Sequence, residues 1–118
     1  MAYLLLILEQ REDRNRRTEA EGQAAYESMS KWRDSLRERG LLQTAEALRP
    51  DRDGVRLSKR NGKRSVMDGP FVESKEMVGG FFLLDCKTKE EAVAIADECP
   101  AAEYATVEVR ELAPCYVK

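Results

Sequence analysis

Apolar and polar positions follow one another along the chain in blocks that predict strands and helices. The first block, Tyr3–Leu8, is too short and too uniformly apolar for a surface helix, so we expect a central strand covered on both faces. Every side chain in residues 9–17 is polar, which predicts a solvated loop with nothing to bury. An arm that grips phosphate is the alternative interpretation of its arginines.

Two helices are marked by their starting residues. Thr18 with Glu21, and Thr88 with Glu91, have the spacing of a capping box, in which side chains bond the first free amides of a helix. Gly40 suits the left-handed end of the first helix. The apolar stripe of that helix predicts a core face, and its members are Ala25, Met29, Trp32 and Leu36. The alternative for the tryptophan is a place in the wall of a ligand pocket.

A β-hairpin is predicted between residues 55 and 67, because apolar and polar residues alternate on both sides of Asn61-Gly62. This pair supplies the two positive φ angles of a type I′ turn. The tip carries the most basic cluster in the chain: Lys59, Arg60, Lys63 and Arg64. Basic residues at a hairpin tip usually keep an edge soluble, and an anionic ligand is the alternative.

Further strands are predicted at residues 41–48, 78–86 and 104–112. The glycine pair Gly79-Gly80 at the start of the second of these indicates a bulge or a close backbone approach. The element order is that of a ferredoxin-like α+β sandwich, βαββαβ, with an inserted hairpin. Its helices cover one face of the sheet, so the other face must be solvated, close a ligand site or pack on a second copy. Phe81 or Phe82 must point to that uncovered face, because neighbouring side chains of a strand face opposite ways. We therefore expect the uncovered face to pack on a second copy in a dimer.

Composition narrows the classes of function. The 118 residues suit a single domain, 1–118, with residues 113–118 as a tail, and they include no histidine. Catalytic systems and metal sites built on imidazole are therefore excluded from a single chain. The cysteines and carboxylates lack metal-ligand spacing, and no phosphate-binding glycine motif occurs, so we expect no metal and no cofactor. Cys86 and Cys99 fit core positions, whereas Cys115 lies in the tail.

Charge and hydropathy indicate where the protein acts. The three cysteines form no disulfide framework, and the apolar run Leu4–Leu8 is too short to span a bilayer, so we expect a cytoplasmic protein that is not inserted in a membrane. The formal net charge of -2 argues against nucleic-acid binding. Residues 1–67 carry 15 basic and 11 acidic side chains, and residues 68–118 carry 5 and 11. Solvated surfaces explain this imbalance, and association of complementary halves is the alternative.

The segment Asp68-Gly69-Pro70-Phe71 has residue types that fix a loop geometry. One interpretation is a turn whose aspartate caps its own backbone. The other is a rigid loop that holds the Asp68 carboxylate as an acid or base, and the Phe71 ring as an apolar wall, at the mouth of a pocket.

Residues 67–81, MDGPFVESKEMVGGF, resemble the signature stretch of the DGPF branch of the YCII-related domain family. The opening YLLLI at residues 3–7, and CPAA and VEVR near the end, are also similar to that family. The resemblance implies a dimeric α+β barrel, in which two ferredoxin-like units enclose a cleft between their open sheet faces. Members mostly have no known function, and DGPF proteins are often encoded beside, or fused to, sigma factors.

The chain departs from this family where many relatives have a histidine before the last strand, because Tyr104 stands there. A mechanism that depends on histidine therefore does not carry over. If chemistry is retained, we expect Asp68 as the base, Tyr104 as a donor and Arg110 as an anion anchor. For Glu108 and Arg110 the alternative is an ion pair with each other or across an interface.

Two functions remain. The first is a homodimeric module without enzymatic activity that binds a small molecule or a protein partner in the inter-sheet cleft. The family resemblance implies a role for this module beside a sigma factor. The second is a cofactor-independent enzyme, similar to isomerases, lyases or dehalogenases, that acts on a small organic acid through Asp68.

Overall fold

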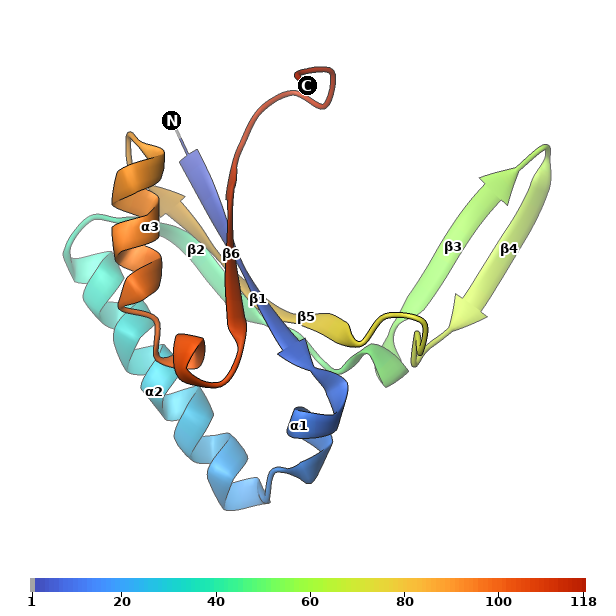
Figure 1. Cartoon of the computed structure of the whole chain (residues 1–118), viewed down its shortest axis with the longest axis horizontal. Helices are drawn as coiled ribbons and strands as arrows, with labels where there is room; N and C mark the ends of the chain where they lie inside the picture. Colours follow the sequence, from blue (N-terminus) through green and yellow to red (C-terminus); the bar gives the residue numbers. More distant parts are fainter. Residues whose placement is uncertain (1) are drawn as a thin grey trace.

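A four-stranded antiparallel sheet forms the centre of the protein in the computed structural model, which describes residues 2–118 (Figure 1). The strands lie in the order β2 (Leu42–Ala47), β5 (Glu76–Asp85), β1 (Ala2–Gln10) and β6 (Thr106–Glu111). Within residues 2–118 there are three helices: α1 (Arg11–Arg16), α2 (Glu19–Glu38) and α3 (Lys89–Asp97). This mixed architecture is compatible with the predicted ferredoxin-like α+β fold, and the central place of β1 is confirmed.

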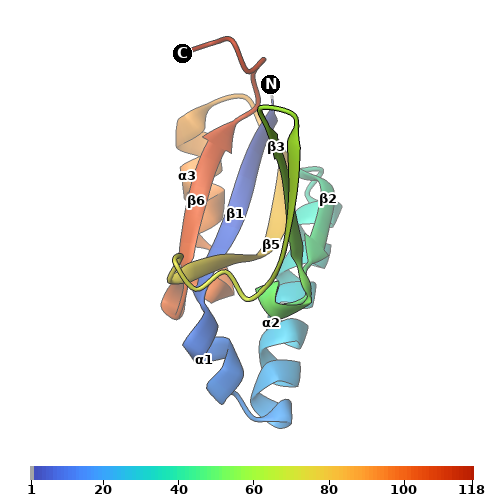
Figure 2. The same ribbon diagram turned by 90° about the vertical axis from the view of Figure 1, so that its right-hand side faces the viewer.

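Helices α2 and α3 cover one face of the sheet (Figure 2). Leu36 of α2 is fully buried, as are Leu5 and Leu84 in the two central strands. The ring centroids of Trp32 and Phe82 lie 4.7 Å apart. Trp32 and Leu36 of the stripe on α2 therefore pack into the core, with Met29 packed against it, as their spacing predicts, whereas Ala25 is not part of this core.

The predicted helix starts are confirmed, with one difference in detail. The hydroxyl of Thr18 accepts a hydrogen bond from the Glu21 amide, and the Glu21 carboxylate accepts one from the Thr18 amide, which completes a capping box. The hydroxyl of Thr88 likewise accepts from the Glu91 amide at 3.2 Å. The Glu91 carboxylate, however, accepts from the amide of Lys87. After α2, Gly40 has a φ of 72°, as a left-handed helix end requires.

The prediction of a solvated loop at residues 9–17 is wrong. Strand β1 continues to Gln10, and α1 occupies most of the remaining segment. The buried positions of β1 alternate, which places Glu9 in phase with Ile7 on the helix-covered face, and its side chain is only 10% exposed. Arg14 of α1 supplies the charge that compensates this burial.

No helix within residues 2–118 covers the other face of the sheet. Its apolar side chains are half-buried within the single chain: Leu4, Leu6 and Leu8 of β1, and Phe81 and Leu83 of β5. The expectation that β1 is covered on both faces is therefore not met by this chain alone. Phe82 faces the helices and Phe81 faces the open side, as the alternation of side chains along a strand requires.

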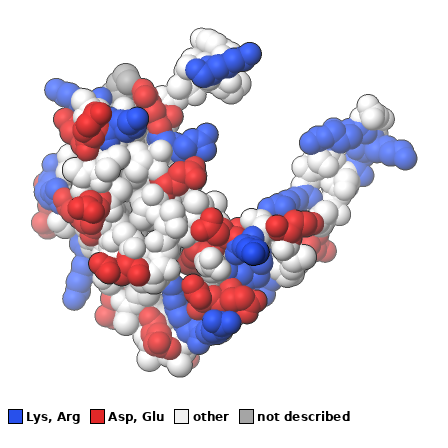
Figure 3. All heavy atoms as spheres, viewed as in Figure 1, with Lys and Arg blue, Asp and Glu red and all other residues white. Residues whose placement is uncertain are grey.

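Strands β3 (Val55–Arg60) and β4 (Lys63–Asp68) form a separate two-stranded hairpin. This arm extends away from the sheet (Figure 1) and ends in its basic tip (Figure 3). Asn61 and Gly62 have φ angles of 52° and 78°, the positive values predicted for the turn. Four apolar residues of the arm are exposed by 46% to 60%: Val55, Leu57, Val66 and Met67.

The remaining elements are short. The 3-10 turns η1 (Asp51–Asp53) and η2 (Pro100–Glu103) precede β3 and β6. The last strand begins two residues later than predicted, which leaves Tyr104 just after η2. Cys86 and Cys99 are buried free thiols and Cys115 is exposed, as expected. Among residues 2–118, no helix combines the length and apolar character needed to cross a membrane.

Candidate ligand-binding pocket

A pocket of about 430 Å³ lies between α2 and the helix-covered face of the sheet. Its size is typical of sites for small molecules. The interior is apolar and is formed by Ile7, Ala25, Met29, Ala45 and Phe82. The polar side chains that could hold a ligand come from β1, α1, α2 and the segments beside them: Glu9, Arg14, Arg17, Arg33 and Tyr104.

Glu9 reaches the pocket because the opposite strand contains a bulge. Ile7 pairs with Gly80 and Leu8 pairs with Val78, so Gly79 is the extra residue of β5. A Cβ atom on Gly79 would lie 2.7 Å from the carboxyl carbon of Glu9 and 2.9 Å from both of its oxygens. A Cβ atom on Gly80 would lie 2.9 Å from the carbonyl oxygen of Glu46. The predicted bulge and the predicted close backbone approach are therefore both confirmed.

Arg14 ties Glu9 to the rest of the chain. Its Nη1 donates to Oε1 of Glu9 at 3.0 Å, and its Nη2 donates to the carbonyl oxygen of Leu48 at 2.8 Å. One guanidinium group thus joins the end of β1 to the residue that follows β2.

Arg17 and Tyr104 form the second polar part of the pocket. The guanidinium carbon of Arg17 lies 4.9 Å from the centre of the Tyr104 ring, within the range of a cation–π contact. Burial raises the pKa of Tyr104 above its ordinary value of 10.0, although the charge of Arg17 opposes this shift. The phenol therefore stays protonated at neutral pH and is a hydrogen-bond donor.

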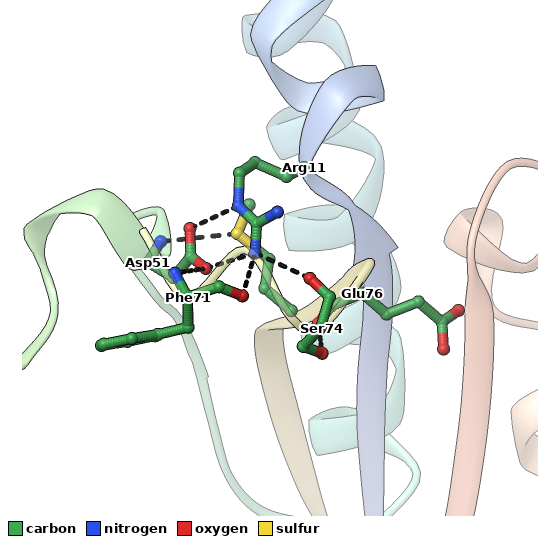
Figure 4. Close-up of polar contacts among 6 residues, drawn as sticks. Arg11, Asp51, Phe71, Ser74 and Glu76 are labelled. Atoms are coloured by element: carbon green, nitrogen blue, oxygen red, sulfur yellow. Dashed lines mark hydrogen bonds and ion pairs between the residues drawn. The ribbon is translucent and has the colours of Figure 1, made fainter. Parts of the chain in front are cut away.

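A second polar cluster lies outside this pocket and bonds the loop backbone at Phe71 and Ser74 (Figure 4). Nε of Arg11 donates to Oδ1 of Asp51 at 2.8 Å, and Nη2 donates to Oδ2 of the same carboxylate and to the carbonyl oxygens of Phe71 and Ser74. Oδ2 of Asp51 also accepts from the Phe71 amide at 3.1 Å. Hydrogen bonding from Arg11 is the main cause that lowers the pKa of Asp51 from 3.8 to about 2, although burial opposes it.

The loop residues around this cluster are closely packed. The ring of Phe71 is buried, and the guanidinium carbon of Arg56 lies 3.9 Å from its centre. A Cβ atom on Gly69 would lie 1.8 Å from the carbonyl oxygen of Asp51, so only glycine fits there. A second pocket, of about 650 Å³, opens between this loop, the base of the arm and the open sheet face, where Leu8 and Val78 line it.

Comparison with known proteins identifies the family. The sequence model of the YCII-related domain matches residues 1–115 of this chain. The chain belongs to the YCII-related domain family. It is also 40% identical over 78 residues to an uncharacterized protein of Rhizobium meliloti (strain 1021). That match covers 64% of this chain and 63% of the other protein, so the chain spans under two thirds of the length of that relative.

The residues predicted to form the site of this YCII-related domain lie in four separate places. Tyr104 lines the pocket between α2 and the sheet. Phe71 lines the second pocket, and Asp68 is exposed at the base of the arm, outside both pockets. Glu108 and Arg110 contact each other at 3.2 Å, and they lie on the open face because they pair with Leu6 and Leu4. The chain by itself does not bring these five residues together.

The carboxylate that bonds the loop backbone is that of Asp51. The amide of Phe71 donates to Asp51, whereas no hydrogen bond of the Asp68 carboxylate is found among residues 2–118. Within the same residues, no group of three or more histidine, cysteine, aspartate or glutamate side chains is placed to hold a metal ion.

Sequence reasoning missed Glu9 and Arg33, two polar residues of the YCII-related domain's pocket, and it considered Arg14 and Arg17 only in the alternative of a phosphate-gripping arm. A signal for Glu9 is present, because it continues the alternation of Tyr3, Leu5 and Ile7 by one further step. The glycine pair of β5 is the complementary signal on the partner strand. No comparable pattern marks Arg17 or Arg33, since both lie among many other arginines.

Proposed function

We propose that this YCII-related domain binds a small carboxylic acid in the pocket between α2 and the sheet. The observation that carries the proposal is the guanidinium of Arg17. It lines the pocket, and among residues 2–118 no carboxylate lies within ion-pair distance of it. The protonated phenol of Tyr104 lies directly beside it as a second donor.

The rest of the pocket supports an amphipathic ligand. A carboxylate on the ligand would pair with Arg17, and planar guanidinium groups bind carboxylates through paired hydrogen bonds. The apolar carbon skeleton would lie against Met29 and Phe82 and release water from them. Of the three arginines at the pocket, Arg14 pairs with Glu9 and Arg33 pairs with Asp34. The charge of Arg17 therefore favours a ligand with negative charge.

A thermal-shift screen of the full chain with millimolar short-chain and phenyl-substituted carboxylic acids tests this function. At least one acid should raise the melting temperature, because ligands that bind only the folded state stabilise it. Arg17→Gln should weaken that ligand by about tenfold. Arg16→Gln is the matched control, because Arg16 is exposed and lies outside the pocket. No shift with any acid, or equal weakening by both substitutions, would contradict the proposal.

We further propose that the domain acts as a homodimer in the form of a dimeric α+β barrel. The open face presents a row of half-buried leucines, and the arm exposes four large apolar side chains. An isolated two-stranded hairpin is marginally stable in water, so the arm requires a surface to pack on. A second copy supplies apolar area of the same kind to both.

Light scattering at micromolar concentration measures the oligomeric state. The wild-type chain should have the mass of a dimer, and Leu6→Arg on the open face should give a folded monomer. Val93→Arg should leave the dimer intact, because Val93 is a half-exposed residue on the outer side of α3. A monomeric wild-type chain would contradict the dimer.

The second function, an enzyme with Asp68 as acid or base, stays a prediction. Asp68 lies outside both pockets of the single chain, so this function would require a site completed by a second copy in the inter-sheet cleft. Asp68→Asn should then abolish turnover of a small organic acid and leave the melting temperature of the dimer almost unchanged. A large loss of stability would instead assign Asp68 a role in the loop. Association with a sigma factor rests on the family resemblance alone.

A further inference from the structure

Glu9 is a buried carboxylate with one side left open to a pocket. It is the one charged residue among residues 2–118 that is buried, with 8% of its surface exposed. Its Oε1 accepts from Arg14, whereas Oε2 has no partner within the described chain. Yet no fully buried side-chain oxygen or nitrogen among residues 2–118 lacks a hydrogen bond. Oε2 is therefore accessible, and the pocket that Glu9 lines is where it can be reached.

The backbone makes room for this carboxylate. The bulge at Gly79 and the missing Cβ of that residue leave the space that the Glu9 carboxylate occupies. A buried charge is costly unless it is paired and hydrogen-bonded. Arg14 neutralises the charge of Glu9, but the second oxygen keeps an unused capacity to accept hydrogen bonds. Because Oε2 is accessible and has no hydrogen-bond partner among residues 2–118, it can accept a hydrogen bond from a ligand group in the pocket.

The polar side chains of the pocket offer complementary chemistry close together. Arg17 and Tyr104 present donors, a guanidinium and a protonated phenol. Oε2 of Glu9 presents only an acceptor, and Glu9 lies near enough to Tyr104 for its charge to contribute to the raised pKa of that phenol. The apolar interior with Met29 and Phe82 forms the third part of the pocket. A ligand that satisfies all three parts has an anionic group, an apolar body and a donor of its own.

We propose that the ligand is a small carboxylic acid that also carries a hydrogen-bond donor, a hydroxyl or an ammonium group, which binds Oε2 of Glu9. This assignment rests on the proposed function of the same pocket, since it places the carboxylate of the ligand at Arg17. Arg14 and Arg33 have carboxylate partners in Glu9 and Asp34, whereas Arg17 has none among residues 2–118. This charge favours a hydroxy acid, which keeps a net negative charge, over an amino acid, which has none.

Three compounds with the same phenyl ring and carboxylate test the assignment by titration calorimetry on the full chain. Hydrocinnamate has no further polar group, phenyllactate adds a hydroxyl, and phenylalanine adds an ammonium. Phenyllactate, with each enantiomer titrated separately, should bind about tenfold more tightly than hydrocinnamate, as expected for a hydrogen bond to a charged acceptor. Phenylalanine should fall between the two.

Substitutions distinguish the role of Glu9 from the proposed binding of carboxylic acids. Glu9→Gln should bring the roughly tenfold ratio between the Kd of hydrocinnamate and the Kd of phenyllactate close to one. Gly79→Ala should lower the same ratio by displacing the carboxylate. Arg17→Gln should weaken all three compounds to a similar degree. Equal binding of hydrocinnamate and phenyllactate by the wild-type chain would overturn the role of Glu9 and leave the proposed function standing. Binding of none of the three would overturn both.

Discussion

The six-residue helix α1 supplies the arginine of two arginine–carboxylate pairs. The pairs differ in how many carboxylate oxygens remain free to bind a ligand. In the pair of Arg11 and Asp51, both carboxylate oxygens are bonded, and the side chains are 14% and 12% exposed. In the pair of Arg14 and Glu9, one oxygen is bonded and the arginine is 29% exposed. The first pair fastens a loop and has no capacity left for a ligand. The second pair holds an acceptor at the edge of a pocket.

The largest effect on stability should come from breaking the closed pair. Asp51→Ala leaves the partly buried guanidinium of Arg11 without its carboxylate and removes the acceptor of the Phe71 amide, so we expect a loss of about 3 kcal/mol in the free energy of unfolding. Glu9→Gln keeps an acceptor for Arg14 and should cost about 1 kcal/mol. Urea unfolding measures both values. Equal losses would remove the distinction between the two pairs.

The next effect concerns the space that Glu9 occupies. Gly79→Ala introduces a Cβ within 3 Å of the Glu9 carboxylate and should destabilise the fold by about 2 kcal/mol. The control is Gly22→Ala in α2, where a Cβ meets nothing within 4 Å. That substitution should stabilise the helix by about 1 kcal/mol. A neutral Gly79→Ala variant would show that the carboxylate has room to move.

Protonation of Asp51 should lower the free energy of unfolding by less than its substitution, because protonation removes the charge and leaves the side chain in place. The pKa of Asp51 is about 2 in the folded chain and 3.8 without its partners. A lowered folded pKa stabilises the protein above pH 3.8, and this contribution is lost as the pH falls towards 2. The difference in stability between wild type and Asp51→Asn should therefore shrink across this window. A difference that is constant from neutral pH to pH 2 would contradict the assignment.

The smallest effect should come from the exposed pair of Glu108 and Arg110 on β6. These side chains are 40% and 67% exposed, and surface pairs of this kind contribute roughly 0–1 kcal/mol. Glu108→Gln should therefore leave the unfolding curve almost unchanged. A loss as large as that of Asp51→Ala would mean that the open face buries this pair against another molecule.

Much of the fold could be predicted from local signals. The hydroxyls of Thr18 and Thr88 bond the first amides of their helices, and Asn61-Gly62 adopts its two positive φ angles. These features depend on residues close together in the sequence, so a single sequence reveals them.

The site could not be predicted to the same extent, because long-range contacts decide it. Asp51 bonds Arg11 and Phe71, which are 40 and 20 residues away from it. Nothing local distinguishes Asp51 from Asp68, which lies in the more conspicuous motif. Glu9 could not be recognised in the same way, because it stands in a run of polar residues and its burial depends on Gly79, 70 residues later.

The geometry of α1 limits the insertions and deletions that the chain can tolerate. Polar surface segments usually accept changes of length, and residues 9–17 have the composition of such a segment. One added residue between Arg11 and Arg14, however, would rotate one arginine relative to the other by about 100° around the helix axis. Only one of the two carboxylates could then keep its partner. The length of this short stretch is therefore as constrained as that of a core strand, although its composition is not.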